Sequence, residues 1–75
     1  MMKESEISIK EEYIRLDSLL KFAGLIGTGG MAKAEIQSGN VKVNGEICTA
    51  RGKKMRSGDK AEYGGSIITV KNADK

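Results

Sequence analysis

The stretch that decides the fold runs from residue 16 to residue 45 and reads LDSLLKFAGLIGTGGMAKAEIQSGNVKVNG. Its first part, Leu16 to Ala23, places apolar residues at i, i+3, i+4 and i+7, which is the spacing of one face of an amphipathic helix. Gly24 suits the end of that helix. The last two residues, Asn44-Gly45, predict a type I′ hairpin turn, because both central positions of that turn need a positive φ. The stretch therefore predicts a helical region that leads into a β-hairpin.

A second helix is predicted between these two signals, from about Gly29 to Ser38. Thr28 is the expected N-cap, because its hydroxyl can accept a hydrogen bond from a free N–H group of the first turn. Gly39 is the expected C′ residue, a position that favours glycine because its φ is positive. Ala32 and Ile36 are expected to face inward. Another face of this helix carries Gly30, Lys33 and Gln37.

Strands are predicted on both sides of the stretch. Ile7 and Ile9 alternate with polar neighbours, and residues 60–63 and 66–71 flank a Gly64-Gly65 turn. Between the two hairpins we expect an irregular basic loop over residues 49–56 and a turn over residues 57–59. The element order predicts an α+β fold with helices on one face of a sheet. We expect one domain over residues 1–75, with a core from about residue 7 to residue 71 and a frayed end at 72–75.

The register of the first hairpin predicts the environment of the only cysteine. A two-residue loop places Val43 opposite Glu46 and Val41 opposite Cys48. Cys48 is therefore expected to be a small buried hydrophobe with an inert thiol. A single cysteine cannot form an internal disulfide, which fits a reducing compartment, and we expect a cytoplasmic protein.

Length and composition exclude several classes of protein. A chain of 75 residues buries only about 60% of its unfolded surface, which leaves no room for a deep cleft between domains. No stretch approaches the ~20 apolar residues of a membrane helix, and the polar residues 1–12 carry no secretory signal. The chain has no histidine and one cysteine, so it can build neither a Ser-His or Cys-His pair nor a common metal site. We expect no catalytic residue, no metal and no cofactor, and hence no enzyme.

Positive charge is concentrated in the middle of the chain. The net charge is +3, but residues 15–60 hold nine Lys and Arg against four Asp and Glu, a balance of +5. The densest basic cluster extends from Arg51 to Arg56, between predicted strands. Such a cluster favours a polyanion partner held through its phosphates. The alternative is an ordinary solvated basic surface.

The run Gly27-Thr28-Gly29-Gly30-Met31-Ala32 formally matches the dinucleotide-binding pattern G-x-G-x-x-A. That interpretation fails because a helix precedes the run and the chain is too short for the surrounding parallel sheet. The N–H groups at the start of the second helix, at Gly29 and Gly30, nevertheless favour a phosphate, and no carboxylate competes in the first turn. Alternatively, these glycines serve only to turn the chain tightly between two packed helices.

Motif positions from Arg15 to about Glu62 form an ordered pattern. They are Arg15-Leu16-Asp17, Leu20, Gly24, Ala32, Ile36, Gly39, Val41, Val43-Asn44-Gly45 and Gly58-Asp59. The pattern resembles the S4 domain of ribosomal protein S4, some pseudouridine synthases and some tyrosyl-tRNA synthetases. More narrowly, Gly29 to Lys33 and Arg51 to Lys54 are similar to the small stand-alone bacterial S4-domain proteins of the YaaA/YbcJ type. The resemblance implies an S4-like (αL) fold, with two helices packed on an antiparallel sheet of four to five strands, and binding to structured RNA such as rRNA or tRNA.

The resemblance also implies which residues contact RNA. In S4 domains the RNA face is formed largely by the two helices, with basic residues at the start of the first and along the second. Carried over by position, these residues are Arg15, Lys21, Lys33 and Gln37. Many S4 domains have arginine where this chain has Gly29. The stand-alone type suggests that the basic loop substitutes for it, through Arg51, Lys53, Lys54 and Arg56.

We therefore expect a monomeric RNA-binding module, with two alternatives. One is a protein-interaction module that docks on a ribosomal or replication partner through the sheet. The other is a binder of small nucleotides that uses the glycine run. Salt dependence separates RNA binding from protein docking, because neutralised phosphates release counterions. A nucleotide titration tests the third possibility.

Overall fold

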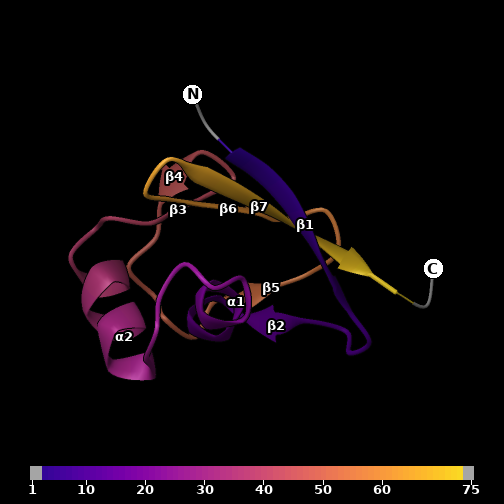
Figure 1. The fold of residues 1–75 in the computed structure, drawn as a ribbon, viewed down its shortest axis with the longest axis horizontal. Helices are drawn as coiled ribbons and strands as arrows, with labels where there is room; N and C mark the ends of the chain where they lie inside the picture. The colour runs from indigo at the N-terminus through magenta and orange to yellow at the C-terminus, as the bar shows by residue number, and fades with distance from the viewer. Residues whose placement is uncertain (1–2, 74–75) are drawn as a thin grey trace.

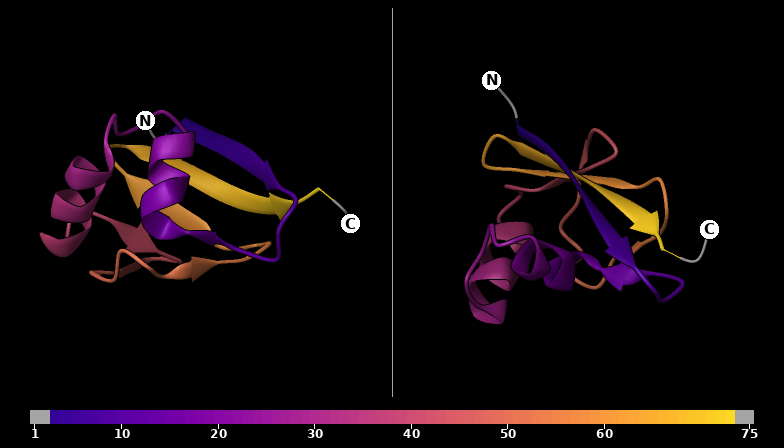
Figure 2. Two further views of the ribbon diagram at one scale, coloured as in Figure 1. Left: turned by 90° about the horizontal axis from the view of Figure 1, so that it is seen from below. Right: turned by 45° about the vertical axis from the view of Figure 1, so that its right-hand side comes forward.

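Two helices lie on one side of a five-stranded sheet in the computed structural model, which describes residues 3–73 (Figure 1). The view from below shows α1 in front of the sheet and α2 beside it (Figure 2). The elements are β1 (Lys3–Ile9), β2 (Ile14–Arg15), α1 (Leu16–Phe22), α2 (Gly29–Gln37), β3 (Lys42–Val43), β4 (Glu46–Ile47), β5 (Lys54–Met55), β6 (Lys60–Tyr63) and β7 (Ser66–Asn72). The α+β class and the two predicted helices are confirmed.

The sheet is mixed rather than antiparallel, which corrects the expectation from sequence. Its order is β1-β7-β6-β3-β4, and β1 pairs with β7 in parallel from Lys3 opposite Ser66 to Ile9 opposite Asn72. The other neighbouring pairs are antiparallel. The first and last strands are joined through all the other elements, and this long connection allows them to run in the same direction, whereas short hairpin loops require antiparallel neighbours.

Both helices end as their glycines predict. The N–H of Leu25 donates to the carbonyl of Leu20, and the N–H of Asn40 donates to that of Glu35. Each bond spans a glycine with positive φ, Gly24 at 77° and Gly39 at 83°. These are Schellman motifs, in which the glycine turns the chain and the last carbonyls of the helix find donors.

The core is a single apolar cluster between the helices and the sheet. Ile36 of α2 and Ile68 of β7 are almost completely buried. The other buried members are Ile9, Leu16, Leu19, Leu20, Ile26, Ala32, Val41, Val43, Met55, Ala61 and Val70. Met55 comes from the segment predicted as an irregular loop.

Three further expectations differ from the structure. Residues 49–56 are not wholly irregular, because β5 pairs with β2 as a separate antiparallel ribbon that anchors Met55 in the core. Cys48 has the predicted register, its N–H donating to the Val41 carbonyl at 3.0 Å, but its side chain is only half-buried. The last strand also extends past residue 71: Asn72 belongs to β7, and the Ala73 N–H donates to the Ile9 carbonyl. The expectation of fraying at residues 74–75 lies outside the described residues.

Candidate nucleic-acid interface

The start of α1 is hydrogen-bonded to the basic segment, Arg51 to Arg56, which follows β4. The N–H of Leu16 donates to the carbonyl of Lys53 at 2.9 Å, and that of Asp17 donates to the carbonyl of Arg51 at 3.1 Å. These carbonyls accept from N–H groups of the first helical turn, which have no partner inside the helix. The backbone therefore fixes the basic segment against the beginning of α1.

The β2–β5 ribbon extends this contact, with its apolar side chains on one face and its basic side chains on the other. Ile14 lies opposite Met55, and Arg15 lies opposite Lys54. Met55 is fully buried and Ile14 packs against the core. Since successive side chains of a strand point to opposite faces, Arg15 and Lys54 are on the outer face together. Two basic residues that are 39 positions apart in the sequence thus become direct neighbours.

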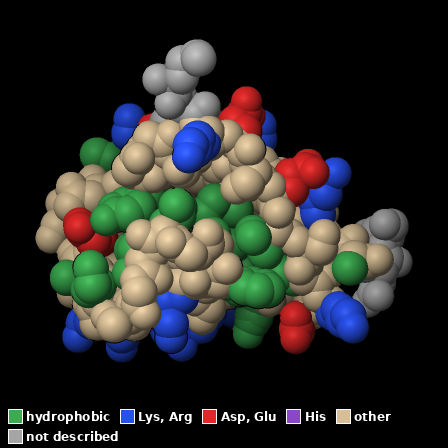
Figure 3. All heavy atoms as spheres, viewed as in Figure 1, with side chains coloured by type: hydrophobic (Ala, Val, Ile, Leu, Met, Phe, Trp, Pro, Cys, Tyr) green, Lys and Arg blue, Asp and Glu red, His purple; other side chains and the backbone are tan. Residues whose placement is uncertain are grey.

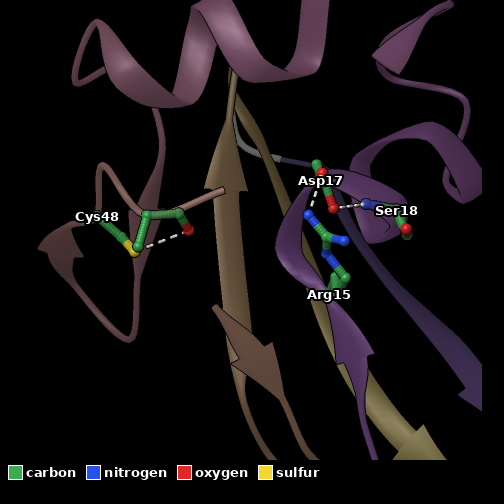
Figure 4. Close-up of polar contacts among 5 residues, drawn as sticks. Arg15, Asp17, Ser18 and Cys48 are labelled. Carbon is green, nitrogen blue, oxygen red and sulfur yellow. Dashed lines mark hydrogen bonds and ion pairs between the residues drawn. The ribbon is translucent and has the colours of Figure 1, made fainter. Parts of the chain in front are cut away.

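The Arg15 guanidinium is oriented by a neighbouring carboxylate. Its Nη2 lies 3.2 Å from Oδ2 of Asp17, whose Oδ1 accepts the Ser18 N–H at 2.8 Å (Figure 4). A Cβ added at Gly52 would lie 3.8 Å from Arg15 Nη2, so the guanidinium rests against this glycine of the basic segment. About half of the Arg15 side chain remains exposed (52%), which leaves it open to a ligand.

Arg56 is held at the far end of the ribbon by two acidic residues. Its side-chain Nη1 lies 3.0 Å from Oε1 of Glu12, and its N–H donates to Oδ2 of Asp59 at 2.8 Å. Asp59 is in turn tied to Asn44, whose Nδ2 donates to Asp59 Oδ1 and whose Oδ1 accepts the Lys60 N–H. The Val-Asn-Gly and Gly-Asp motifs therefore connect two turns and position the end of the basic segment.

The start of α2 has open space around its glycines. A Cβ at Gly29 or Gly30 would meet nothing within 4 Å, and neither has a positive φ. Thr28 caps the helix through its hydroxyl, which accepts the Met31 N–H, and the first turn has no acidic residue. The turn between the helices therefore does not require glycine at these two positions, which removes the turn-only explanation.

The second helix is fastened to the sheet at its other end. The Tyr63 hydroxyl of β6 donates to Oε1 of Glu35 at 3.1 Å, and Asn40 donates to the other carboxylate oxygen. The hydrogen bond to Glu35, together with burial and the charge of that carboxylate, raises the pKa of Tyr63 above its usual value. Lys33 and Gln37 are exposed on the same helix, and Lys21 is exposed on α1.

The structure thus brings some of the predicted residues together and leaves others apart. Arg15, Lys53 and Lys54 meet through the backbone bonds and the ribbon. Within residues 3–73, no ion pair joins Lys21, Lys33 or the basic residues 51–54 to a carboxylate. Lys and Arg side chains gather along the lower edge of the molecule, beneath the helices (Figure 3). The ribbon itself escaped prediction because two-residue strands have no periodicity.

Other kinds of site find no support in the part of the chain that the structure describes. Residues 3–73 contain no cluster of three or more Cys, Asp or Glu side chains placed to bind a metal ion. No helix among these residues has the length and apolar character that crossing a membrane requires. Cys48 lies apart from Arg15, and its sulfur is 3.8 Å from the Ala50 carbonyl oxygen (Figure 4).

The chain is a small α+β domain with a basic ribbon at the start of its first helix, and comparison with known proteins identifies its family. The family model for the S4 domain matches residues 7–71. The chain therefore belongs to the S4 domain family, as its motif pattern predicted.

Two known proteins are similar over most of their length. A Bacillus subtilis protein described as the probable ribosome maturation protein RlbA is 44% identical over 59 residues, which are 79% of this chain and 83% of that protein. The solution structure of YbcJ from E. coli, described as revealing an αL motif involved in RNA binding, matches with a TM-score of 0.66 and 30% identity. That match covers 95% of this chain and 89% of YbcJ, so the predicted similarity to S4-domain proteins of the YbcJ type is confirmed.

Proposed function

We propose that this chain binds structured RNA, with ribosomal RNA as the first candidate, and that it acts by binding rather than by catalysis. One observation carries the proposal: the start of α1 and the basic segment are locked together, so that Arg15 and Lys54 share one exposed face. Phosphate groups of RNA are the ligands that such a fixed cluster of cations fits. YbcJ is described as having a motif involved in RNA binding, and RlbA as a probable ribosome maturation protein. Both descriptions support the proposal that this chain binds RNA.

The proposed contact surface combines the ribbon with the exposed faces of both helices. The ribbon and basic segment would bind phosphates of one strand, while the open start of α2 offers backbone N–H groups to another phosphate. Cations that have no ion pair with a carboxylate can bind a phosphate without first breaking such a pair. The proposed RNA contacts are Arg15, Lys21, Gly29, Gly30, Lys33, Gln37, Arg51, Lys53, Lys54 and Arg56. We further propose that the chain acts as a monomer in the cytoplasm, where ribosomes mature.

A pair of charge-matched double variants tests the proposal. Lys53→Gln with Lys54→Gln removes two cations of the basic segment, whereas Lys3→Gln with Lys71→Gln removes two from the β1–β7 edge of the sheet (Figure 1). We expect the first variant to bind a ribosomal RNA fragment roughly tenfold more weakly or worse, since each phosphate contact carries a large share of the affinity at moderate salt. The second should bind within about twofold of the parent protein.

Fluorescence anisotropy of a labelled RNA fragment provides the measurement, and thermal melting shows that both variants fold. Equal losses in the two variants would mean that only net charge matters, which would contradict a localised interface. Parent-like binding by both would exclude Lys53 and Lys54 from the interface, whereas no RNA binding by the parent protein would favour the alternative of docking on a protein partner through the sheet.

A further inference from the structure

The outer face of the β2–β5 ribbon carries an aromatic ring among three cations. Arg15 and Lys54 are cross-strand partners on this face. Tyr13 lies two residues before Arg15, and Arg56 lies two residues after Lys54, so the strand period of two places all four side chains on the same side. The opposite side of the ribbon carries Met55, which belongs to the core, and Ile14, which packs against it.

The ring is in contact with two of these cations. The Lys54 ammonium lies 5.0 Å from the centroid of the Tyr13 ring, and the Arg56 guanidinium carbon lies 5.8 Å from it. Both distances are within the ~6 Å over which a cation is attracted to an aromatic face. Tyr13 is 37% exposed, so it is not part of the core and its ring lies at the surface of the β2–β5 ribbon.

An open hollow adjoins the ring and differs in charge from the rest of the ribbon. It is lined by Glu11, Glu12, Tyr13, Ile14 and Arg15. The two carboxylates disfavour a phosphate in this hollow, but they can accept hydrogen bonds from the exocyclic amino groups of a base. Phosphate is expected on the side of Lys54, the cross-strand neighbour of Arg15, away from the two carboxylates. The ribbon thus separates a place for a base from a place for its backbone.

We propose that Tyr13 is a stacking platform for one unpaired base of the bound RNA, with Arg15, Lys54 and Arg56 holding the adjacent phosphates. This inference rests on the proposed RNA binding and names the kind of RNA preferred: a helix interrupted by a bulged or otherwise unpaired nucleotide. Aromatic rings beside cations are the means by which proteins hold unpaired nucleotides, because every base has a face that can stack. The competing explanation is that the ring only supports the aliphatic stems of Lys54 and Arg56.

Two RNA hairpins that differ in one nucleotide test the inference. The first carries a single bulged 2-aminopurine nucleotide, whose fluorescence reports stacking, and the second is the same hairpin fully paired. The parent protein should bind the bulged hairpin about 5- to 150-fold more tightly, the range that base–aromatic stacking provides, and should change the 2-aminopurine signal on binding. Tyr13→Leu keeps apolar bulk without the ring and should abolish the preference. Tyr13→Phe keeps the ring and should retain it.

The possible outcomes separate the inference from the proposed function. If the parent binds both hairpins equally tightly and leaves the 2-aminopurine signal unchanged, the stacking role is wrong, whereas RNA binding stands. If Tyr13→Leu keeps the parent's preference, the ring serves only as support. If the parent binds neither hairpin, the proposed function falls, and the inference falls with it. An unchanged 2-aminopurine signal with the parent protein contradicts the inference even if a variant folds poorly.

Discussion

Asn44 connects two turns that are far apart in the sequence, and its effect on stability can be divided into two parts. Its backbone has a positive φ of 52°, which costs an L-residue energy, and its side chain hydrogen-bonds to Asp59 and to the Lys60 N–H. Asn44→Ala loses the bonds and keeps the strain, so the free energy of unfolding should fall by about 2 kcal/mol.

Asn44→Gly provides the matched control, because glycine adopts this backbone without strain. Its loss should be about half as large, because the same side-chain bonds are removed but the backbone strain is relieved. Urea unfolding of the two variants and the parent measures the order. Equal losses in both variants would contradict a contribution from the backbone, and no loss in either would show that the link to Asp59 adds nothing.

At single residues, the sequence predicts local conformation better than distant contacts. The Asn44-Gly45 turn and its register were predicted correctly, because turn type depends on the two residues themselves. The bonds from Asn44 to Asp59 and Lys60 could not be predicted, because they span 15 and 16 positions. Cys48 shows the same limit: its partner Val41 follows from register, but its half-exposure follows from the position of β4 at the edge of the sheet.

The start of α2 offers a prediction about a whole element. Gly30→Ala and Gly30→Glu both fill open space, and both should keep the fold, with the alanine variant more stable by about 0.5–1 kcal/mol. Glutamate in the first turn is also compatible with the helix dipole. RNA binding should differ: Gly30→Ala should bind nearly as the parent does, whereas Gly30→Glu should bind clearly more weakly, because its carboxylate repels the phosphate.

Melting temperature and RNA affinity, measured together on the two variants, test this expectation. Lys33→Ala, one turn further along the same helix, should also weaken binding and make the salt slope shallower by about one unit. A well-folded Gly30→Glu protein that binds like the parent would exclude a phosphate site at the start of α2.

Elements with a clear period were predictable, and the shortest ones were not. Both helices and the second hairpin follow from apolar spacing and glycine positions. The β2–β5 ribbon has two residues in each strand, too few for any alternation to be recognised. The ribbon holds the predicted basic loop in a fixed position, so that Lys54 shares one face with Arg15, and it adds Tyr13 to that face.

At the scale of the whole molecule, the motif pattern predicts the family, while sequence cannot predict the pairing of the chain ends. The parallel contact of β1 with β7 joins residues about 63 positions apart and is not encoded in either strand alone. The candidate interface was predicted as a set of residues, but not as a surface. Only the structure shows that Arg15 lies beside Lys54 and that Arg15 and Arg56 already have acidic partners.

Those acidic partners affect the expected electrostatics modestly. The ion pair between Arg56 and Glu12 and that between Arg15 and Asp17 are at the surface, where such pairs contribute little and exchange readily for a phosphate. The cations on the helices and the basic segment can therefore act together on an RNA backbone. The six principal candidates are Arg15, Lys21, Lys33, Lys53, Lys54 and Arg56.

The central claim, that this surface binds RNA through its phosphates, is tested most directly by the salt dependence of affinity. Binding of the parent protein to a structured ribosomal RNA fragment should be measured by anisotropy over a series of salt concentrations. Six phosphate contacts at ~0.7–0.9 counterions each predict that log K falls against log salt with a slope of about −4 to −5. A flat slope with binding intact would contradict the account, because neutralised phosphates always release counterions.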